Sequence, residues 1–327
     1  MSTGEVIVVT DGLTKRFDEF VAVDQFNLEV KAGTVVSLLG PNGAGKTTIV
    51  RMLATLIEPS AGTAKVCGYD VVKDGDAVRS VLSLTGQFAA LEDNLTASEN
   101  LILMARLRGY SRKAAGRITE NLIDRFEIGE FRDKLVKAVS GGQRRRVDLA
   151  ASLVVQPRVL VLDEPTTGLD PRSRQVVWST IRELVATGVT LFLTTQYLEE
   201  ADALADYIVL LDDGRATAEG TANDLKSQIG EQRVDVVAAD AVGLEKLVLG
   251  LSSSFHLKIS TEQRMISIPA PDEVNDLAKV AAAVHEVGVE VDEIALRRPT
   301  LDDAFMALTG QPLSNDQLSD DQEEFRP

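Results

Sequence analysis

The 327-residue sequence contains one cysteine, two histidines, few aromatic residues and no long apolar run. The lone Cys67 rules out an internal disulfide and fits a reducing compartment, where a small buried apolar group is its more ordinary role than a reactive thiol. His256 and His285 have no cysteine or second histidine nearby, which argues against a metal site. No stretch approaches the ~18–20 apolar residues that span a membrane, and the N-terminus lacks signal-peptide features. We therefore expect a soluble, cytosolic chain that reaches a membrane only through a partner.

Positive charge is also scarce. The 34 Lys and Arg residues are outnumbered by 50 Asp and Glu residues, which gives a formal net charge of −16. Because nucleic-acid binding needs a basic surface, this balance argues against nucleic acid as the main partner. The hydrophobic content of 44% is ample for a packed core, and the length predicts two domains.

The most informative stretch follows an apolar run that begins at Thr34 and predicts a buried strand. It reads Gly-x-x-x-x-Gly-Lys-Thr and opens a helix over residues 48–53, which is the phosphate-binding loop pattern. Its glycines let backbone N–H groups point at one anion, and the helix presents its positive end to the same anion. We expect Lys46 to reach the β- and γ-phosphates and the Thr47 hydroxyl to ligate Mg²⁺. The predicted nucleotide contacts are Gly40, Pro41, Asn42, Gly43, Ala44, Gly45, Lys46, Thr47 and Thr48.

A pair of carboxylates follows the apolar run 159–162, which is typical of a central parallel strand. Ligands bind beyond the carboxyl ends of such strands, so Asp163 can hold Mg²⁺ through water and Glu164 can act as general base. A turn beyond them contains Asp170, which either caps a helix or reaches across a subunit boundary. Another apolar strand, residues 189–195, ends just before Gln196.

A second anion-facing helix start is predicted at Ser140-Gly141-Gly142-Gln143, ahead of a helix over 144–155. One loop suffices for the phosphates of one nucleotide. A second such site makes physical sense if it closes over the γ-phosphate of a nucleotide held by another copy. A simple capped helix is the alternative.

Between these motifs the sequence predicts helices rather than strands. A short strand delivers Gln87, and a capping-box pattern at 96–99 precedes one helix, with a second over 111–126. The basic residues of this lobe form either a solvated face or a docking surface for a partner.

Strand–helix alternation predicts a mostly parallel sheet with helices on both faces, beside a small antiparallel sheet that includes strands at 6–9 and 26–30. After residue 229 the order becomes β-α-β-β-α-β, the split pattern of a ferredoxin-like unit. Thr300 and Asp303 then cap a last helix. From Gln311 onward the chain is polar and acidic, and we expect disorder.

These motifs together make the chain resemble the nucleotide-binding subunit of ATP-binding-cassette (ABC) transporters, over about Val6 to Leu225. The similarity rests on the phosphate loop, Gln87, the signature from Val139 to Gln143, the Asp163-Glu164 pair and the loop 168–170. It implies ATP and Mg²⁺ as cofactors and adenine stacking on Phe17. It also implies a head-to-tail dimer, in which Ser140 and Gly142 face the ATP of the other copy.

The resemblance also defines the expected organisation and partners. It implies a P-loop ATPase with a RecA-like parallel sheet, an antiparallel β subdomain and a helical lobe at about 88–156. Residues 1–228 form this cassette, 229–310 a regulatory or dimer-bracing domain, and 311–327 a disordered tail. Membrane permease subunits are expected to dock at the lobe and near Gln87, and the chain is expected at the cytoplasmic face of the membrane. The metal set implied is Thr47, Gln87 and Asp163, and the catalytic set is Glu164, Gln196, Lys46 and Gln87.

One departure concerns Gln196, because the family usually has a histidine there. Gln offers only a neutral hydrogen bond to the γ-phosphate, a loss of about 1–2 kcal/mol of transition-state contact. The Thr-Thr-Gln-Tyr-Leu segment and residues 301–310 resemble the daunorubicin/doxorubicin-resistance branch of bacterial exporters, although Val139 and Gln143 stand where that branch often has Tyr and Met. The alternatives are a soluble cassette ATPase acting on the ribosome or DNA, and a nucleotide-sensing regulator that hydrolyses poorly.

Overall fold

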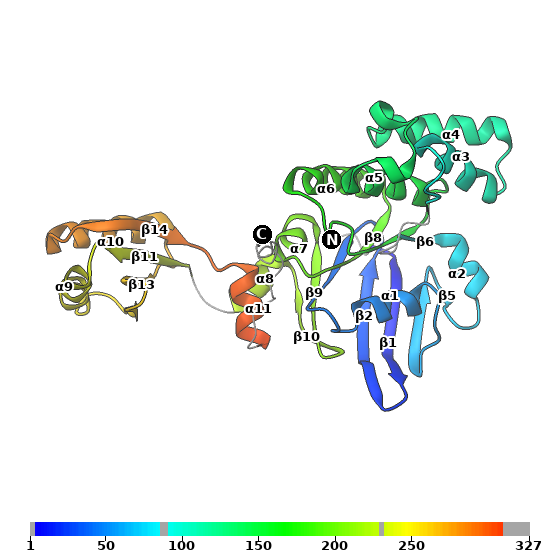
Figure 1. Ribbon diagram of the computed structural model, residues 1–327. Helices are drawn as coiled ribbons and strands as arrows, with labels where there is room; N and C mark the ends of the chain where they lie inside the picture. The colour runs from blue at the N-terminus through cyan, green and yellow to red at the C-terminus, as the bar shows by residue number, and fades with distance from the viewer. Residues whose placement is uncertain (1–3, 86–90, 229–231, 310–327) are drawn as a thin grey trace, which may run out of the picture. The chain divides into compact units, whose positions relative to one another are not determined.

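The computed structural model describes residues 4–85, 91–228 and 232–309 (Figure 1). They divide into two compact units, of which the first contains residues 4–222 and 308–309 and the second Asn223–Ala307. Among the described residues, no helix is long and apolar enough to cross a membrane.

A six-stranded sheet forms the centre of the first unit, in the order β10-β9-β3-β8-β7-β6. Its neighbours pair in parallel except for β10, which forms an antiparallel hairpin with β9. The strands are β3 (Val35–Leu39), β6 (Leu82–Thr85), β7 (Val159–Asp163), β8 (Thr190–Thr195), β9 (Tyr207–Asp212) and β10 (Arg215–Gly220). Every residue of β3, β7 and β8 is buried, which explains their unbroken apolar runs.

The first unit also contains an antiparallel sheet, with the strand order β2-β1-β4-β5. Its strands are β1 (Val6–Phe17), β2 (Phe20–Lys31), β4 (Ala61–Val66) and β5 (Tyr69–Asp70). The predicted end of the first strand at residue 9 is wrong, because pairing continues to Phe17, opposite Phe20. Register shifts along β1 break the simple alternation that marks a strand in sequence. Half-buried Cys67 follows β4 with a φ of 51°.

Helices cover both faces of the central sheet, as its alternation predicted. They are α1 (Lys46–Leu53), α2 (Gly75–Val81), α3 (Ala97–Leu107), α4 (Arg112–Arg125), α5 (Gly141–Ser152), α6 (Pro171–Ala186) and α7 (Leu198–Leu204). The predicted capping box of α3 is present, with Thr96 and Glu99 as its partners. Helix α5 begins at Gly141 rather than at residue 144 and ends at Ser152, because Ser140 serves as its N-cap.

The second unit is built around an antiparallel sheet in the order β12-β13-β11-β14. Its elements are α8 (Ala222–Gln228), β11 (Arg233–Ala238), α9 (Ala241–Leu251), β12 (Lys258–Ser260), β13 (Met265–Pro269), α10 (Glu273–Val287), β14 (Val291–Arg297) and α11 (Leu301–Thr309). From β11 to β14 the predicted β-α-β-β-α-β order is confirmed, and α9 and α10 share one apolar core with the sheet. Thr300 and Asp303 exchange backbone-to-side-chain hydrogen bonds at the start of α11.

Candidate nucleotide site

Three neighbouring parallel strands end at the same edge of the central sheet and place the predicted chemistry together. The Gly40 N–H donates to the Thr195 carbonyl (3.3 Å), which joins the end of β3 to the end of β8. The Glu164 N–H donates to the Thr194 carbonyl (3.1 Å), which joins β7 to β8. The phosphate loop, Glu164 and Gln196 therefore leave the sheet side by side, where parallel sheets bind ligands.

Two glycines of the loop have no room for a side chain. A β-carbon on Gly40 would lie 2.2 Å from the Leu211 carbonyl oxygen. On Gly45, which has a φ of +96°, it would lie 2.5 Å from the Ala22 carbonyl oxygen. Gly45 is the N-cap of α1 and makes no side-chain capping bond, so the first turn of the helix offers its N–H groups to an anion.

Lys46 is the buried cation of this loop, with 4% of its surface exposed. Its Nζ donates to the carbonyls of Gly40 (2.7 Å) and Pro41 (2.8 Å) and lies 3.8 Å from Glu164 Oε1. Burial lowers the pKa of Lys46, and the nearby carboxylates of Glu164 and Asp163 oppose that shift. A positive group held here is suited to the phosphates of a nucleotide.

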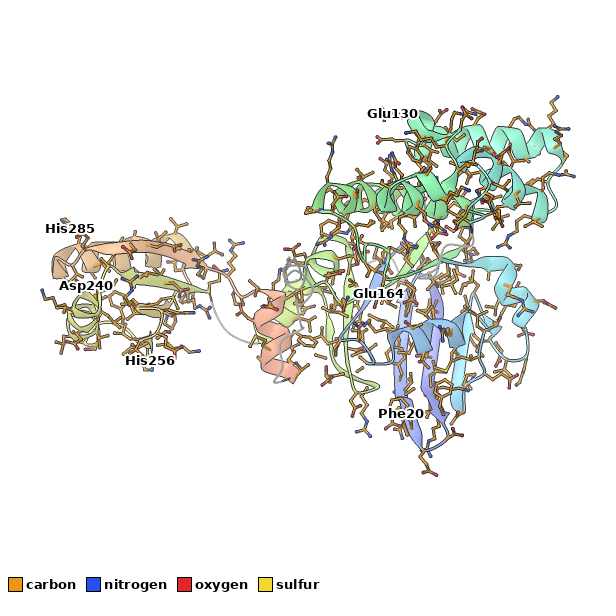
Figure 2. The ribbon with its side chains drawn as sticks, in the orientation of Figure 1. Phe20, Glu130, Glu164, Asp240, His256 and His285 are labelled. Atoms are coloured by element: carbon orange, nitrogen blue, oxygen red, sulfur yellow. The ribbon has the colours of Figure 1, made fainter. Side chains whose placement is uncertain are left out.

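Asp163 and Thr47 supply the oxygen atoms that a hard cation prefers. The Thr47 hydroxyl donates to Asp163 Oδ1 (3.3 Å), as does the Thr194 hydroxyl (2.5 Å). One hydroxyl and one carboxylate suit Mg²⁺, which usually keeps several waters and binds substrate phosphates. The described residues contain no group of three or more His, Cys, Asp and Glu side chains that could hold a metal by themselves. His256 and His285 belong to the second unit (Figure 2).

Glu164 adopts a left-handed backbone conformation, with a φ of 48°. Its N–H is held by the carbonyl and hydroxyl oxygens of Thr194, both at 3.1 Å. Its carboxylate accepts a bond from the Thr167 hydroxyl at 3.2 Å. Strain of this kind costs roughly 1–3 kcal/mol and is retained where a side chain must point in one direction. The side chain lies at the carboxyl edge of the sheet (Figure 2).

The N-terminus of α5 is capped by side chains of its own first turn. The Gln143 N–H donates to the Ser140 hydroxyl (3.3 Å), and the Ser140 N–H donates to Gln143 Oε1 (3.1 Å). Gly142 permits a close approach to α6, because a β-carbon there would lie 2.4 Å from the Ser173 hydroxyl. Gly141 has space for a side chain, because a β-carbon there would lie 3.8 Å from Leu169 Cδ2.

Three more predicted residues are Asp170, Phe17 and Gln87. Asp170 caps α6, because Oδ1 accepts from the Ser173 N–H (3.0 Å) and Oδ2 from its hydroxyl (2.5 Å). These bonds lower the pKa of Asp170. Phe17 ends β1 with 47% of its surface exposed and Lys15 Nζ 5.1 Å from its ring centre. Gln87 lies outside the described residues.

Sequence reasoning missed a buried polar network directly behind Glu164. Arg145 Nε donates to the Pro165 carbonyl (2.9 Å), and Arg145 Nη1 donates to Asp148 (2.8 Å). Glu200, which is fully buried, accepts bonds from Thr166 (2.8 Å) and Trp178 (3.0 Å). Burial raises the pKa of Glu200. The sequence gives little sign of this network. Its residues are charged and become buried only through packing, and three consecutive arginines are more typical of an exposed helix face.

The fold and the loop define a phosphate-loop ATPase. The ABC transporter family profile matches residues 23–167. The chain is 47% identical to a daunorubicin resistance ATP-binding protein of Streptomyces coeruleorubidus, over 94% of this chain and 96% of the relative. It is 43% identical to a doxorubicin resistance ATP-binding protein of Mycobacterium tuberculosis H37Rv, over 95% and 96%.

Solved structures agree with these relatives. The ATP-binding subunit of an ABC transporter matches with a TM-score of 0.61 at 26% identity, over 68% of this chain and 92% of that one. A dimeric ATP-binding cassette with ADP and phosphate matches with a TM-score of 0.60 at 25% identity, over 66% and 98%. The chain belongs to the family of ABC transporter ATP-binding subunits, and it is an ABC ATPase that hydrolyses ATP for transport.

Proposed function

We propose that this chain powers a bacterial exporter through an ATP site built on Lys46, Thr47, Asp163 and Glu164. The single observation behind this proposal is that the phosphate loop and the strained Glu164 follow β3 and β7, the two strands that flank β8, at one edge of the sheet. Lys46 exchanges its bonds to loop carbonyls for bonds to the β- and γ-phosphates. Glu164 accepts a proton from the attacking water, with Gln196 beside the γ-phosphate.

The Thr47 hydroxyl would hold Mg²⁺ directly and Asp163 would hold it through water, and the ion would supply positive charge opposite the phosphates. The 3.3 Å hydrogen bond between Thr47 and Asp163 supports this assignment, because it already brings the two oxygens together. Phe17, whose ring is about half exposed, stacks on the adenine.

A second copy completes the site. The N–H groups of Gly141 and Gly142 on one copy approach the γ-phosphate bound by the other, in a head-to-tail dimer. The relative solved as a dimer with ADP and phosphate supports this arrangement. Asp170 caps its own helix, and its exposure leaves it available at the same boundary.

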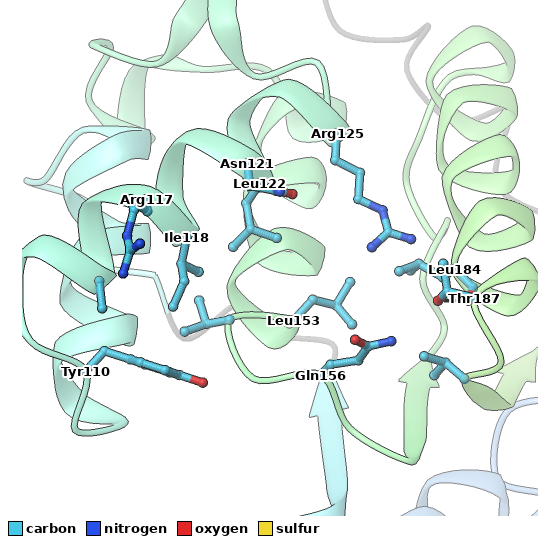
Figure 3. Close-up of a pocket in the computed structure, with 13 residues that line it drawn as sticks. Tyr110, Arg117, Ile118, Asn121, Leu122, Arg125, Leu153, Gln156, Leu184 and Thr187 are labelled. Carbon is cyan, nitrogen blue, oxygen red and sulfur yellow. Dashed lines mark hydrogen bonds between the residues drawn. The ribbon is translucent and has the colours of Figure 1, made fainter.

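The membrane subunit docks on the helical lobe, in a cavity of about 560 Å³ beside α4 and α5 (Figure 3). Its apolar lining includes Ile118, Leu122 and Leu153, while Arg117 and Arg125 supply positive charge. No acidic side chain is among its lining residues. The occupant that fits this chemistry is a short amphipathic segment of the membrane subunit with an apolar face and a carboxylate.

The transported substrates are hydrophobic drugs of the anthracycline type, or lipids. The proposal for drugs rests on relatives named for resistance to daunorubicin and doxorubicin, which this chain matches over nearly its whole length. The chain acts at the cytoplasmic face of the membrane, bound to its membrane subunit.

The decisive measurement is Mg²⁺-dependent ATP hydrolysis by the purified chain, with and without the membrane subunit encoded beside it. Glu164→Gln keeps the size of the side chain and removes the base, so kcat is expected to fall about 10²- to 10⁴-fold while ATP binding is retained. Equal, negligible rates in both proteins, even with the membrane subunit, would instead favour a nucleotide-sensing regulator, in which Gln196 makes hydrolysis slow.

A further inference from the structure

Three consecutive arginines on α5 bind three different parts of the first unit. Arg144 pairs with Asp93 (2.6 Å), and Arg146 donates to the Glu127 carbonyl (3.0 Å) of the helical lobe. Arg145 alone turns toward the ATP site, where its Nε donates to the Pro165 carbonyl at 2.9 Å. Pro165 directly follows Glu164, so this guanidinium holds the backbone next to the hydrolytic carboxylate.

Arg145 is itself held in one orientation. Its Nη1 donates to Asp148 Oδ2 at 2.8 Å, and the two side chains are 11% and 9% exposed. One planar guanidinium therefore joins a carboxylate of its own helix to a carbonyl of the catalytic loop. Lysine cannot reproduce this, because its single ammonium lacks the fixed fork of an arginine.

The loop after Glu164 is anchored on its other side as well. The Thr166 hydroxyl donates to Glu200 at 2.8 Å, and Thr166 and Glu200 are both fully buried. With the Glu164 N–H fixed by Thr194, the loop is held by β8, α7 and, through Arg145, α5. Of these three contacts, only the one made by Arg145 comes from α5, the helix that Ser140 caps.

We propose that Arg145 is a positioning residue that aligns Glu164 and links it to the helix start at Ser140. This rests on the proposed function, in which that helix start faces the nucleotide of the second copy. When α5 engages that nucleotide, Arg145 transmits the position of α5 to the Pro165 carbonyl. Each copy thereby couples the nucleotide it contacts through α5 to the nucleotide it hydrolyses with Glu164.

The first test measures kcat, binding of a fluorescent ATP analogue and the melting temperature for the full-length chain. Arg145→Lys is expected to lower kcat about 10- to 100-fold, because small misplacements of a reacting group have effects of that size. Analogue binding is expected to stay at the wild-type level. Arg146→Lys is the matched control: it alters another guanidinium-to-carbonyl bond on the same helix and should leave kcat unchanged.

A second variant separates positioning from folding. Arg145→Met combined with Asp148→Leu removes both buried charges together, so neither is left unpaired. A wild-type melting temperature with low kcat would support positioning. Wild-type kcat together with wild-type stability in the double variant would overturn the positioning role. Wild-type kcat in Arg145→Lys would also overturn it, as would loss of analogue binding in the double variant.

The link to Ser140 is tested by combining Arg145→Lys with Ser140→Ala. If Arg145 transmits the engagement of α5, the two losses in kcat overlap, and the double variant loses less than their product. Losses that simply multiply would overturn the link. A wild-type chain that hydrolyses no ATP would defeat the proposed function and this inference together, whereas normal wild-type hydrolysis with unaffected variants would defeat the inference alone.

Discussion

Helices α1 and α5 both begin with glycine-rich turns, but their first turns are completed differently. Helix α1 starts from a left-handed Gly45 without a side-chain cap. Helix α5 is closed by a capping box between Ser140 and Gln143. The first helix start has no side-chain cap, whereas in the second the capping box holds the Gln143 N–H. A helix start that is already capped can engage and release the nucleotide of the proposed second copy without local folding.

The buried cations of α1 and α5 also differ in how they are bonded within the chain. Lys46 of α1 has backbone carbonyls as its hydrogen-bond acceptors, with the nearest carboxylate oxygen at 3.8 Å. Arg145 of α5 is paired with Asp148 of the same helix. The cation of α1 is placed to exchange its bonds for a ligand, while the cation of α5 is fixed as part of the scaffold.

The largest effect is expected from a β-carbon at the start of α1. In Gly45→Ala the methyl group meets the Ala22 carbonyl and the residue must hold a φ of +96°. Strain of this kind costs roughly 1–3 kcal/mol, and the distorted loop should lose ATP binding. The matched control is Gly141→Ala at the start of α5, where the new methyl group would lie 3.8 Å from Leu169 Cδ2. Chemical unfolding measures the stability of both variants, and titration with a fluorescent ATP analogue measures their ATP binding. Equal losses of stability and binding in the two variants would show that the two helix starts tolerate a side chain equally.

A pH-dependent contribution to stability is expected from Asp148. Burial raises its pKa to about 6 although Arg145 and Arg144 act to lower it, and Arg145 also faces Glu200 and Asp163. Because the folded-state pKa exceeds the unfolded one, the carboxyl's contribution to the unfolding free energy declines as pH rises from about 4 to about 6, by up to about 3 kcal/mol. Urea unfolding of the wild type and of Asp148→Asn at several pH values should show that difference between them. Parallel curves would mean that Asp148 does not titrate in this range.

A smaller effect is expected at the N-cap of α5. Ser140→Ala removes the acceptor for the Gln143 N–H and should cost about 1 kcal/mol of stability. ATP binding at α1 should remain, while hydrolysis falls because the second helix start is loosened. Ser111→Ala is the matched control, since Ser111 caps α4 through the Ala114 N–H at the same distance of 3.3 Å. A control that lowers hydrolysis equally would trace the effect to general stability.

The sequence predicted those features that depend on neighbouring residues. The phosphate loop, the strand before it, the capping box at residues 96–99 and the Ser140 N-cap are local patterns, and each appears in the structure. The sequence leaves two roles open for Asp170, and in the structure it accepts the Ser173 N–H as the N-cap of α6. The bond from Arg145 to Pro165 joins residues 20 positions apart and depends on how α5 packs, so no local pattern could predict it. Residues 10–17 escaped prediction as strand because register shifts disturb their alternation.

The scarcity of sulfur gives this chain a practical property. Cys67 is the only thiol, it is half-buried, and burial raises its pKa, so little reactive thiolate forms near neutral pH. A cysteine introduced at an exposed position would therefore take up a spectroscopic label with little background from the native thiol. Labels placed near Ser140 and near the phosphate loop of separate copies would report the opening and closing of the dimer as a change in distance between them.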